Sequence, residues 1–109
     1  PLSDAAIGIL GSMAKYLEQP LVFPSPTGVV LSDTALSKTL KSLAREVTVH
    51  GMRSSFRGWC AEQTAYPDAV CELALAHSPK DRVQAAYQRS DLLAKRRGLM
   101  SDWARFLYP

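Results

Sequence analysis

Apolar residues recur at helical spacing near the start of the chain and predict a first helix there. The stripe advances in steps of four, three and four residues, through Ala6, Leu10, Met13 and Leu17. Ser3 and Asp4 precede the stripe and are typical of a helix N-cap. We expect this helix to end near Pro20.

A loop and a second helix are expected next. Residues 21–23 suit a short extended piece, and residues 24–28 hold two prolines and a glycine, which predict a loop. Ser32 and Asp33 are expected to cap the second helix. Its apolar stripe consists of Leu36, Leu40, Leu43 and Val47. Its other face is basic and carries Lys38, Lys41 and Arg45.

Two further helices combine core residues with polar candidates. The third is expected to start around Gly51, with Arg53 and Arg57 on one face beside the packed residues. Those packed residues are Met52, Phe56, Trp59 and Cys60. Pro67 suits the start of a fourth helix, which is expected to deliver His77 at its end. Its anchoring residues are Val70, Leu73 and Ala74.

The last part of the chain predicts a short helix over residues 81–87 and a long final helix capped by Ser90 and Asp91. The buried side of the final helix is expected to consist of Leu92, Leu99, Met100, Trp103 and Leu107. The fold class is therefore mainly α, a helical bundle with at most a vestigial strand.

Composition changes this picture only slightly. Apolar residues make up 47% of the chain and charged residues 21%, which favours one globular domain rather than disorder. The formal net charge of +3 is a mild indication of an anionic partner. Cys60 and Cys71 fall in expected helices and favour a reduced, cytoplasmic setting. No apolar run approaches the roughly 20 residues of a membrane span.

Four separated residues carry the candidate chemistry: His50, Arg53, His77 and Tyr87. Two imidazoles, a guanidinium and a phenol suit an attack by a phenolic oxygen on a phosphodiester, because all four can donate to phosphate oxygens. Arg53 offers a planar fork that fits two oxygens of one phosphate. Tyr87 is the candidate nucleophile. Only about one phenol in a thousand is ionised at pH 7, so nearby cations or a base must assist it.

Each of these residues alone has a simpler interpretation. His77 would be a structural histidine, Tyr87 an amphipathic core residue and Arg53 a surface ion-pair partner; the ordered set reverses that preference. Three further arginines are expected to contact phosphates or acidic neighbours, namely Arg57, Arg82 and Arg89. The spacing of the histidines and cysteines matches no common zinc pattern, so no metal site is expected.

The order His-x-x-Arg, Leu-x-His, and Tyr87 followed four residues later by Asp91 resembles the C-terminal catalytic half of the tyrosine recombinases, specifically the phage-type integrases. The resemblance extends from the opening Pro1 to Trp103. It implies the helical C-terminal portion of the DNA breaking and rejoining catalytic fold. It also implies site-specific recombination of double-stranded DNA through a 3′-phosphotyrosyl intermediate, with no metal or other cofactor. His50, Arg53 and His77 would match the family's histidine, second arginine and later histidine, and Tyr87 its nucleophile.

The chain departs from that family in one respect. An earlier arginine and a lysine on a β-hairpin have no counterpart here, and the chain opens on Pro1 rather than methionine. We therefore expect residues 1–109 to be a C-terminal fragment of an integrase catalytic domain, incomplete alone, from a protein that forms homotetramers on DNA in the bacterial cytoplasm. Two alternatives stay open: a topoisomerase-like enzyme without strand exchange, and a non-catalytic helical module for DNA binding or oligomerisation.

Overall fold

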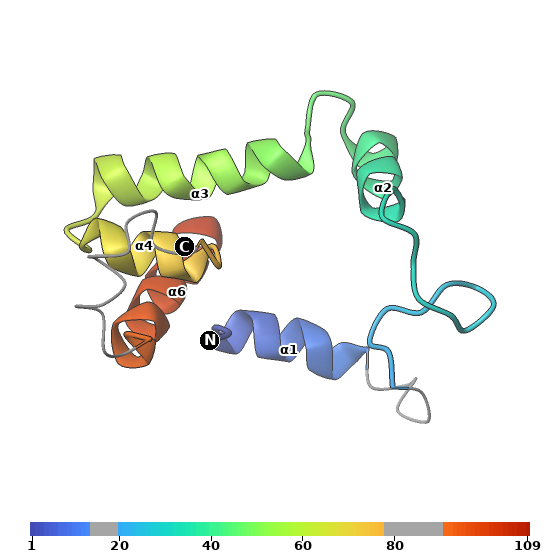
Figure 1. Cartoon of the computed structure of the whole chain (residues 1–109), viewed down its shortest axis with the longest axis horizontal. Helices are drawn as coiled ribbons and strands as arrows, with labels where there is room; N and C mark the ends of the chain where they lie inside the picture. The colour runs from blue at the N-terminus through green and yellow to red at the C-terminus, as the bar shows by residue number, and fades with distance from the viewer. Residues whose placement is uncertain (14–19, 78–90) are drawn as a thin grey trace.

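The computed structural model describes residues 1–13, 20–77 and 91–109 (Figure 1). These residues form helices and no strand, so the mainly α fold class is confirmed for the described part of the chain. The described helices are α1 (Asp4–Ser12), α2 (Ala35–Leu43), α3 (Val49–Gln63), α4 (Asp68–Ala74) and α6 (Leu93–Leu107). The short helix expected over residues 81–87 lies outside the described residues.

The hydrophobic core lies where α3, α4 and α6 meet (Figure 1). Its buried members come from all three helices and are Phe56, Trp59, Cys60, Val70, Cys71 and Leu99. Trp103 of α6 extends the core, with its ring centroid 5.0 Å from that of Trp59. Aromatic pairs at such separations add about 0.5–1.5 kcal/mol beyond the area they bury. This core fixes α3 against the end of α4, which becomes important for the site.

Side-chain caps explain where several helices begin. The hydroxyl of Ser3 accepts a hydrogen bond from the N–H of Ala6, so the N-cap expected for the first helix is confirmed. Pro67 is the N-cap residue of α4, as its fixed backbone angle favours. Before α6, Oδ1 of Asp91 accepts from the N–H of Leu93. The side chains of Ser3 and Asp91 each satisfy a backbone donor that the helix itself leaves free, whereas Pro67 makes no side-chain capping bond.

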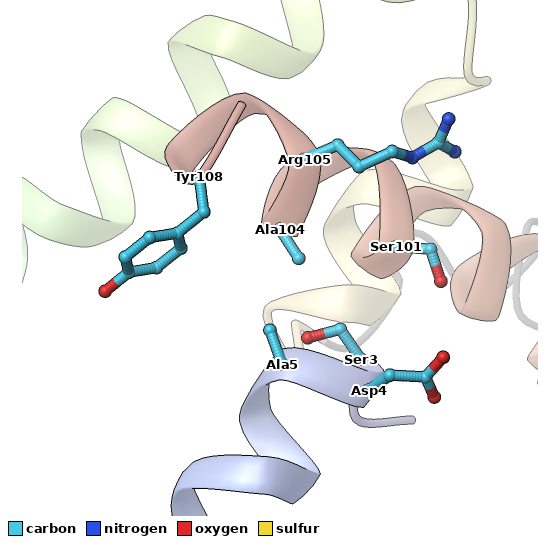
Figure 2. Close-up of a pocket in the computed structure, with 7 residues that line it drawn as sticks. All are labelled: Ser3, Asp4, Ala5, Ser101, Ala104, Arg105 and Tyr108. Carbon is cyan, nitrogen blue, oxygen red and sulfur yellow. The ribbon is translucent and has the colours of Figure 1, made fainter.

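The first helix lies against the last one, and a pocket of about 280 Å³ opens between them (Figure 2). Ser3 and Ala5 face it from α1 and its cap, and Ala104 and Tyr108 from the end of α6. None of the four candidate site residues that the structure describes, His50, Arg53, Arg57 and His77, lines this pocket.

The second helix differs most from the expectation. It begins after Thr34, whose side chain makes no capping bond, so the cap expected at Ser32 and Asp33 is wrong. Leu36 and Leu43 are 57% and 79% exposed, and Val47 lies beyond the helix. Leu40, from the same apolar stripe, is half-buried, so the described part of the chain covers this face only in part. Met52, near the start of α3, and Leu107, at the end of α6, were expected to pack and are each 51% exposed.

Residues 20–48 form an open region that extends away from the packed helices (Figure 1). Residues 21–23 form no strand. The radius of gyration is 16.4 Å, whereas a compact domain of this length has about 13 Å. Within the described residues, no helix is both long and apolar enough to cross a membrane.

Candidate functional site

Helix α3 carries three of the candidate residues on its polar side. His50, Arg53 and Arg57 follow at steps of three and four residues, which places them on one face. The helix begins at Val49, two residues earlier than expected, because the hydroxyl of Thr48 accepts from the N–H of Gly51 at 2.9 Å. His50 and Arg53 are exposed. The first two turns of α3 therefore present an imidazole and a guanidinium to solvent.

Arg53 reaches across to the residues that follow α4. Its Nη2 donates to the carbonyl oxygen of Leu75 at 2.8 Å and lies 2.7 Å from Nε2 of His77. Because a guanidinium can only donate, Nε2 of His77 must be the acceptor in that bond. Two residues separated by 24 positions thus meet at the surface.

The chain reverses after α4 in a way that holds His77 beside Arg53. The N–H of His77 donates to the carbonyl of Glu72, and the N–H of Ala76 donates to that of Leu73. These two bonds, with Ala76 in the left-handed conformation at φ 57°, form a Schellman motif. A left-handed alanine costs about 1–2 kcal/mol, so the surrounding contacts must hold it in place. His77 is positioned by backbone bonds as well as by its ring.

Glu72 links His77 to Arg57 in a small polar network. Its Oε2 lies 2.6 Å from Nδ1 of His77, and its Oε1 accepts from Nε of Arg57 at 2.7 Å. Arg57 also donates through Nη2 to Asp68 at 2.6 Å. With Nδ1 facing a carboxylate and Nε2 accepting from Arg53, His77 is assigned as the neutral tautomer that carries its proton on Nδ1.

The charges of this network support one another. The hydrogen bond from His77, followed by that from Arg57, lowers the pKa of Glu72 below its usual value. Hydrogen bonds to Asp68 and then Glu72 raise the pKa of Arg57. Glu72 is therefore ionised over the neutral pH range and Arg57 is charged. The network therefore joins the guanidiniums of Arg53 and Arg57 and the carboxyl groups of Glu72 and Asp68 with the imidazole of His77.

The structure brings some of the sequence candidates together and leaves others undescribed. Arg53 and His77 are in contact, and His50 lies one turn before Arg53 on the same helix. Arg57 contacts acidic neighbours, which was one of its two expected roles. Tyr87, Arg82 and Arg89 lie outside the described residues, so the nucleophile and two of the expected phosphate contacts stay predictions.

Glu72 and Asp68 were not recognised from the sequence. A carboxylate five residues before a candidate histidine, at the end of the same expected helix, was the available signal for Glu72. Asp68 gave no such signal, because its bond to Arg57 joins two helices. Among the described residues, no group of three or more histidines, cysteines and acidic residues could hold a metal ion. Burial, followed by a hydrogen bond with Cys71, raises the pKa of Cys60 to about 12, so it is a packed thiol rather than a thiolate.

This helical chain, in which an arginine and a histidine pair at the surface, is similar to two integrases. The chain is 34% identical over 110 residues to the prophage integrase IntA of Escherichia coli (strain K12), an alignment that covers 95% of this chain and 26% of that protein. It is 31% identical over 115 residues to the integrase of Enterobacteria phage P4, covering 98% of this chain and 26% of that protein.

The chain thus spans about a quarter of the length of the curated relatives it matches, 26% in each case. No family model matches it, and no solved structure gives a significant match.

Proposed function

We propose that this chain takes part in site-specific DNA recombination as the C-terminal part of the catalytic domain of a longer tyrosine-type integrase. Tyr87 is the nucleophile, and His50, Arg53 and His77 hold the scissile phosphate. The observation that carries the proposal is the 2.7 Å contact between Nη2 of Arg53 and Nε2 of His77 at the surface. Similarity to two integrases over almost the whole chain supports DNA as the substrate.

The reaction exchanges one phosphate ester for another. The phenolic oxygen of Tyr87 forms a bond to phosphorus while the bond to the 5′ oxygen breaks, giving a 3′-phosphotyrosyl link and a free 5′-hydroxyl. The phenolic proton passes to a base, and the leaving oxygen takes up a proton from an acid outside this chain. The phosphodiester energy is kept in the covalent link, so the reaction needs neither a metal nor another cofactor.

Arg53 must rearrange to bind a phosphate through two parallel N–H donors. Its two Nη2 protons are directed to Leu75 and His77. Either fork of a guanidinium includes Nη2, so a phosphate held by two parallel bonds displaces one of these contacts. Displacing the bond to His77 frees Nε2 to contact a second phosphate oxygen. The paired state is therefore a resting arrangement that the substrate opens.

The proposal includes the wider contacts with DNA. Arg82 and Arg89 contact phosphates, and Arg57 contributes less because Asp68 and Glu72 already hold it. Binding is driven mainly by phosphate contacts and therefore weakens as salt rises. The longer protein acts as a homotetramer on double-stranded DNA in the bacterial cytoplasm. Analytical ultracentrifugation of its DNA complex tests that assembly.

The decisive experiment is a search for a covalent nucleotide on Tyr87. The chain and a longer integrase that contains it are incubated with nicked DNA carrying the attachment region, and peptides are analysed by mass spectrometry. We expect an adduct on Tyr87 from the longer protein, none from the isolated chain, and none from Tyr87→Phe. If the longer protein binds this DNA without forming an adduct, the non-catalytic DNA-binding alternative replaces the proposal.

A further inference from the structure

We propose that Glu72 is a positioning residue, which fixes the tautomer of His77 and thereby decides which ring nitrogen faces Arg53 and an incoming phosphate. Its link to DNA cleavage rests on the proposed function, but its effect on the histidine ring does not.

Each oxygen of Glu72 accepts from a different element. Oε2 faces Nδ1 of His77, beyond the end of α4, and Oε1 accepts from Nε of Arg57 on α3. The side chain of Glu72 is 39% exposed, so it is a surface group held by these bonds rather than by burial. An ionised carboxylate accepts on both oxygens and donates from neither, which suits two donors. Glutamine offers one acceptor and one donor, so Glu72→Gln loses one of the two bonds.

The consequence for His77 follows from its ring. A proton held on Nδ1 leaves Nε2 with a lone pair, which accepts from Arg53. When a phosphate oxygen takes the place of that N–H, Nε2 needs a proton from solvent to donate to it. The resulting imidazolium keeps its Nδ1–H bond to the Glu72 carboxylate, which stabilises the new charge. Glu72 thus lets one ring serve as an acceptor before DNA binds and as a donor afterwards.

No other carboxylate of the described residues offers a substitute for Glu72 beside His77. Among the described residues, Arg53 of α3 and Glu72 of α4 face the ring directly. Asp68 acts only through Arg57. Arg96 of α6 donates to the carbonyl of Leu73 and pairs with Asp91. In the described part of the chain, Glu72 is therefore the carboxylate in contact with His77.

Nitrogen NMR of the histidine rings in the isolated chain tests the positioning role directly. The chain has 2 histidines, so a His50→Gln background leaves the His77 signals alone. In this background we expect the neutral tautomer with its proton on Nδ1. The donor on Arg53 also favours a proton on Nδ1, so Arg53→Ala is added to this background. There Glu72→Gln should shift the ring nitrogens towards the other tautomer, while Asp68→Asn, which alters the same Arg57 network, should leave them unchanged. A wild-type ring protonated on Nε2 alone, or nitrogens that do not respond to Glu72→Gln, would overturn the proposal.

Cleavage by the longer integrase tests the functional consequence. We expect Glu72→Gln to slow formation of the Tyr87 adduct by about tenfold to a hundredfold, as loss of a carboxylate that orients a ligand histidine does at metal sites. The optimum of the pH profile should move, and DNA affinity should change much less. Adduct formation at the wild-type rate would overturn the catalytic role of Glu72 while leaving the proposed function intact. Absence of an adduct in the wild-type protein overturns the proposed function itself, and the NMR result then decides the positioning role alone.

Discussion

The packed helices α3, α4 and α6 and the open region of residues 20–48 carry similar apolar periodicity but use it differently. Val70 and Leu99 are fully buried where three helices converge, whereas Leu43 of α2 is 79% exposed. Periodicity determines which face of a helix can be buried, and a facing element determines whether it is buried. An apolar stripe in the sequence therefore specifies only one half of a helix interface.

The candidate side chains that the structure describes lie on the packed helices rather than in the open region. Arg53 and Arg57 lie on α3, and Glu72 and His77 lie at the end of α4, above the core. Side chains that must meet within hydrogen-bond distance need rigid supports, because small displacements weaken the geometry that catalysis requires. An exposed site on well-packed helices meets this condition, and the open region offers no such support.

The largest expected effect is a difference in the free energy of unfolding between a substitution in the packed helices and one in the open region. Leu99→Ala removes a fully buried side chain from the core and should lower the free energy of unfolding by about 2–5 kcal/mol. Leu43→Ala makes the same chemical change at an exposed position of α2 and should stay within about 0.5 kcal/mol. Urea denaturation of both variants measures the difference. Similar losses would mean that α2 is as well packed in solution as α6.

A second substitution should affect chemistry without affecting stability. Arg53→Ala removes an exposed guanidinium from the candidate site, and we expect it to raise the barrier to adduct formation in the longer integrase by about 3–4 kcal/mol, by analogy with an oxyanion-hole donor. DNA binding should weaken much less. Arg97→Ala removes an equal charge from the exposed side of α6 and is the matched control. Equal losses of binding and cleavage would argue against a role for Arg53 in the transition state.

A third substitution probes a polar contact inside the packed region. The hydroxyl of Tyr66 donates to Oδ2 of Asp102 at 2.6 Å, and Gly98 leaves room for it, since an added Cβ there would lie 3.0 Å from that oxygen. Tyr66→Phe should therefore lower the free energy of unfolding by about 1–2 kcal/mol, in the lower range for a bond to a charged group at a half-buried site.

The difference in unfolding free energy between the wild type and Tyr66→Phe should depend on pH with a definite sign. The hydrogen bond to Asp102 raises the pKa of Tyr66 in the folded state. The stabilisation is then fully present below the unfolded pKa of about 10 and disappears as pH rises through the folded value. The difference between wild type and Tyr66→Phe, measured by thermal unfolding at several pH values, should shrink above about pH 10. Cys60, which also titrates at high pH, is common to both proteins and cancels. A difference that grows with alkalinity would contradict this account.

The sequence predicted most of what depends on neighbouring residues. The cap at Ser3, the start of α4 at Pro67 and the buried faces around Phe56 and Leu99 all follow from local pattern and are confirmed. The exposed face of α2 could not be predicted, because the pattern does not reveal which elements approach it.

The sequence identified residues of the candidate site but did not predict the hydrogen bonds that join them. The resemblance to integrases singled out Arg53 and His77, which the structure brings together. It did not reveal Glu72, since its role depends on two bonds to residues 5 and 15 positions away. Nor did periodicity predict the left-handed Ala76, a conformation that glycine would ordinarily adopt. Such features arise from how helices pack against each other.

The smallest effect compares two threonines that precede helices in the two regions. The hydroxyl of Thr48 accepts from the N–H of Gly51 at the start of α3, whereas the side chain of Thr34 makes no capping bond at the start of α2. Thr48→Ala should lower the free energy of unfolding by about 1 kcal/mol, and Thr34→Ala should stay within about 0.5 kcal/mol. Denaturation curves measure both. His50 lies in the first turn of α3, so the ring signals of His50 should shift in Thr48→Ala and remain unchanged in Thr34→Ala. Unchanged His50 signals in both variants would mean that the cap stabilises α3 without ordering the turn that carries the candidate histidine.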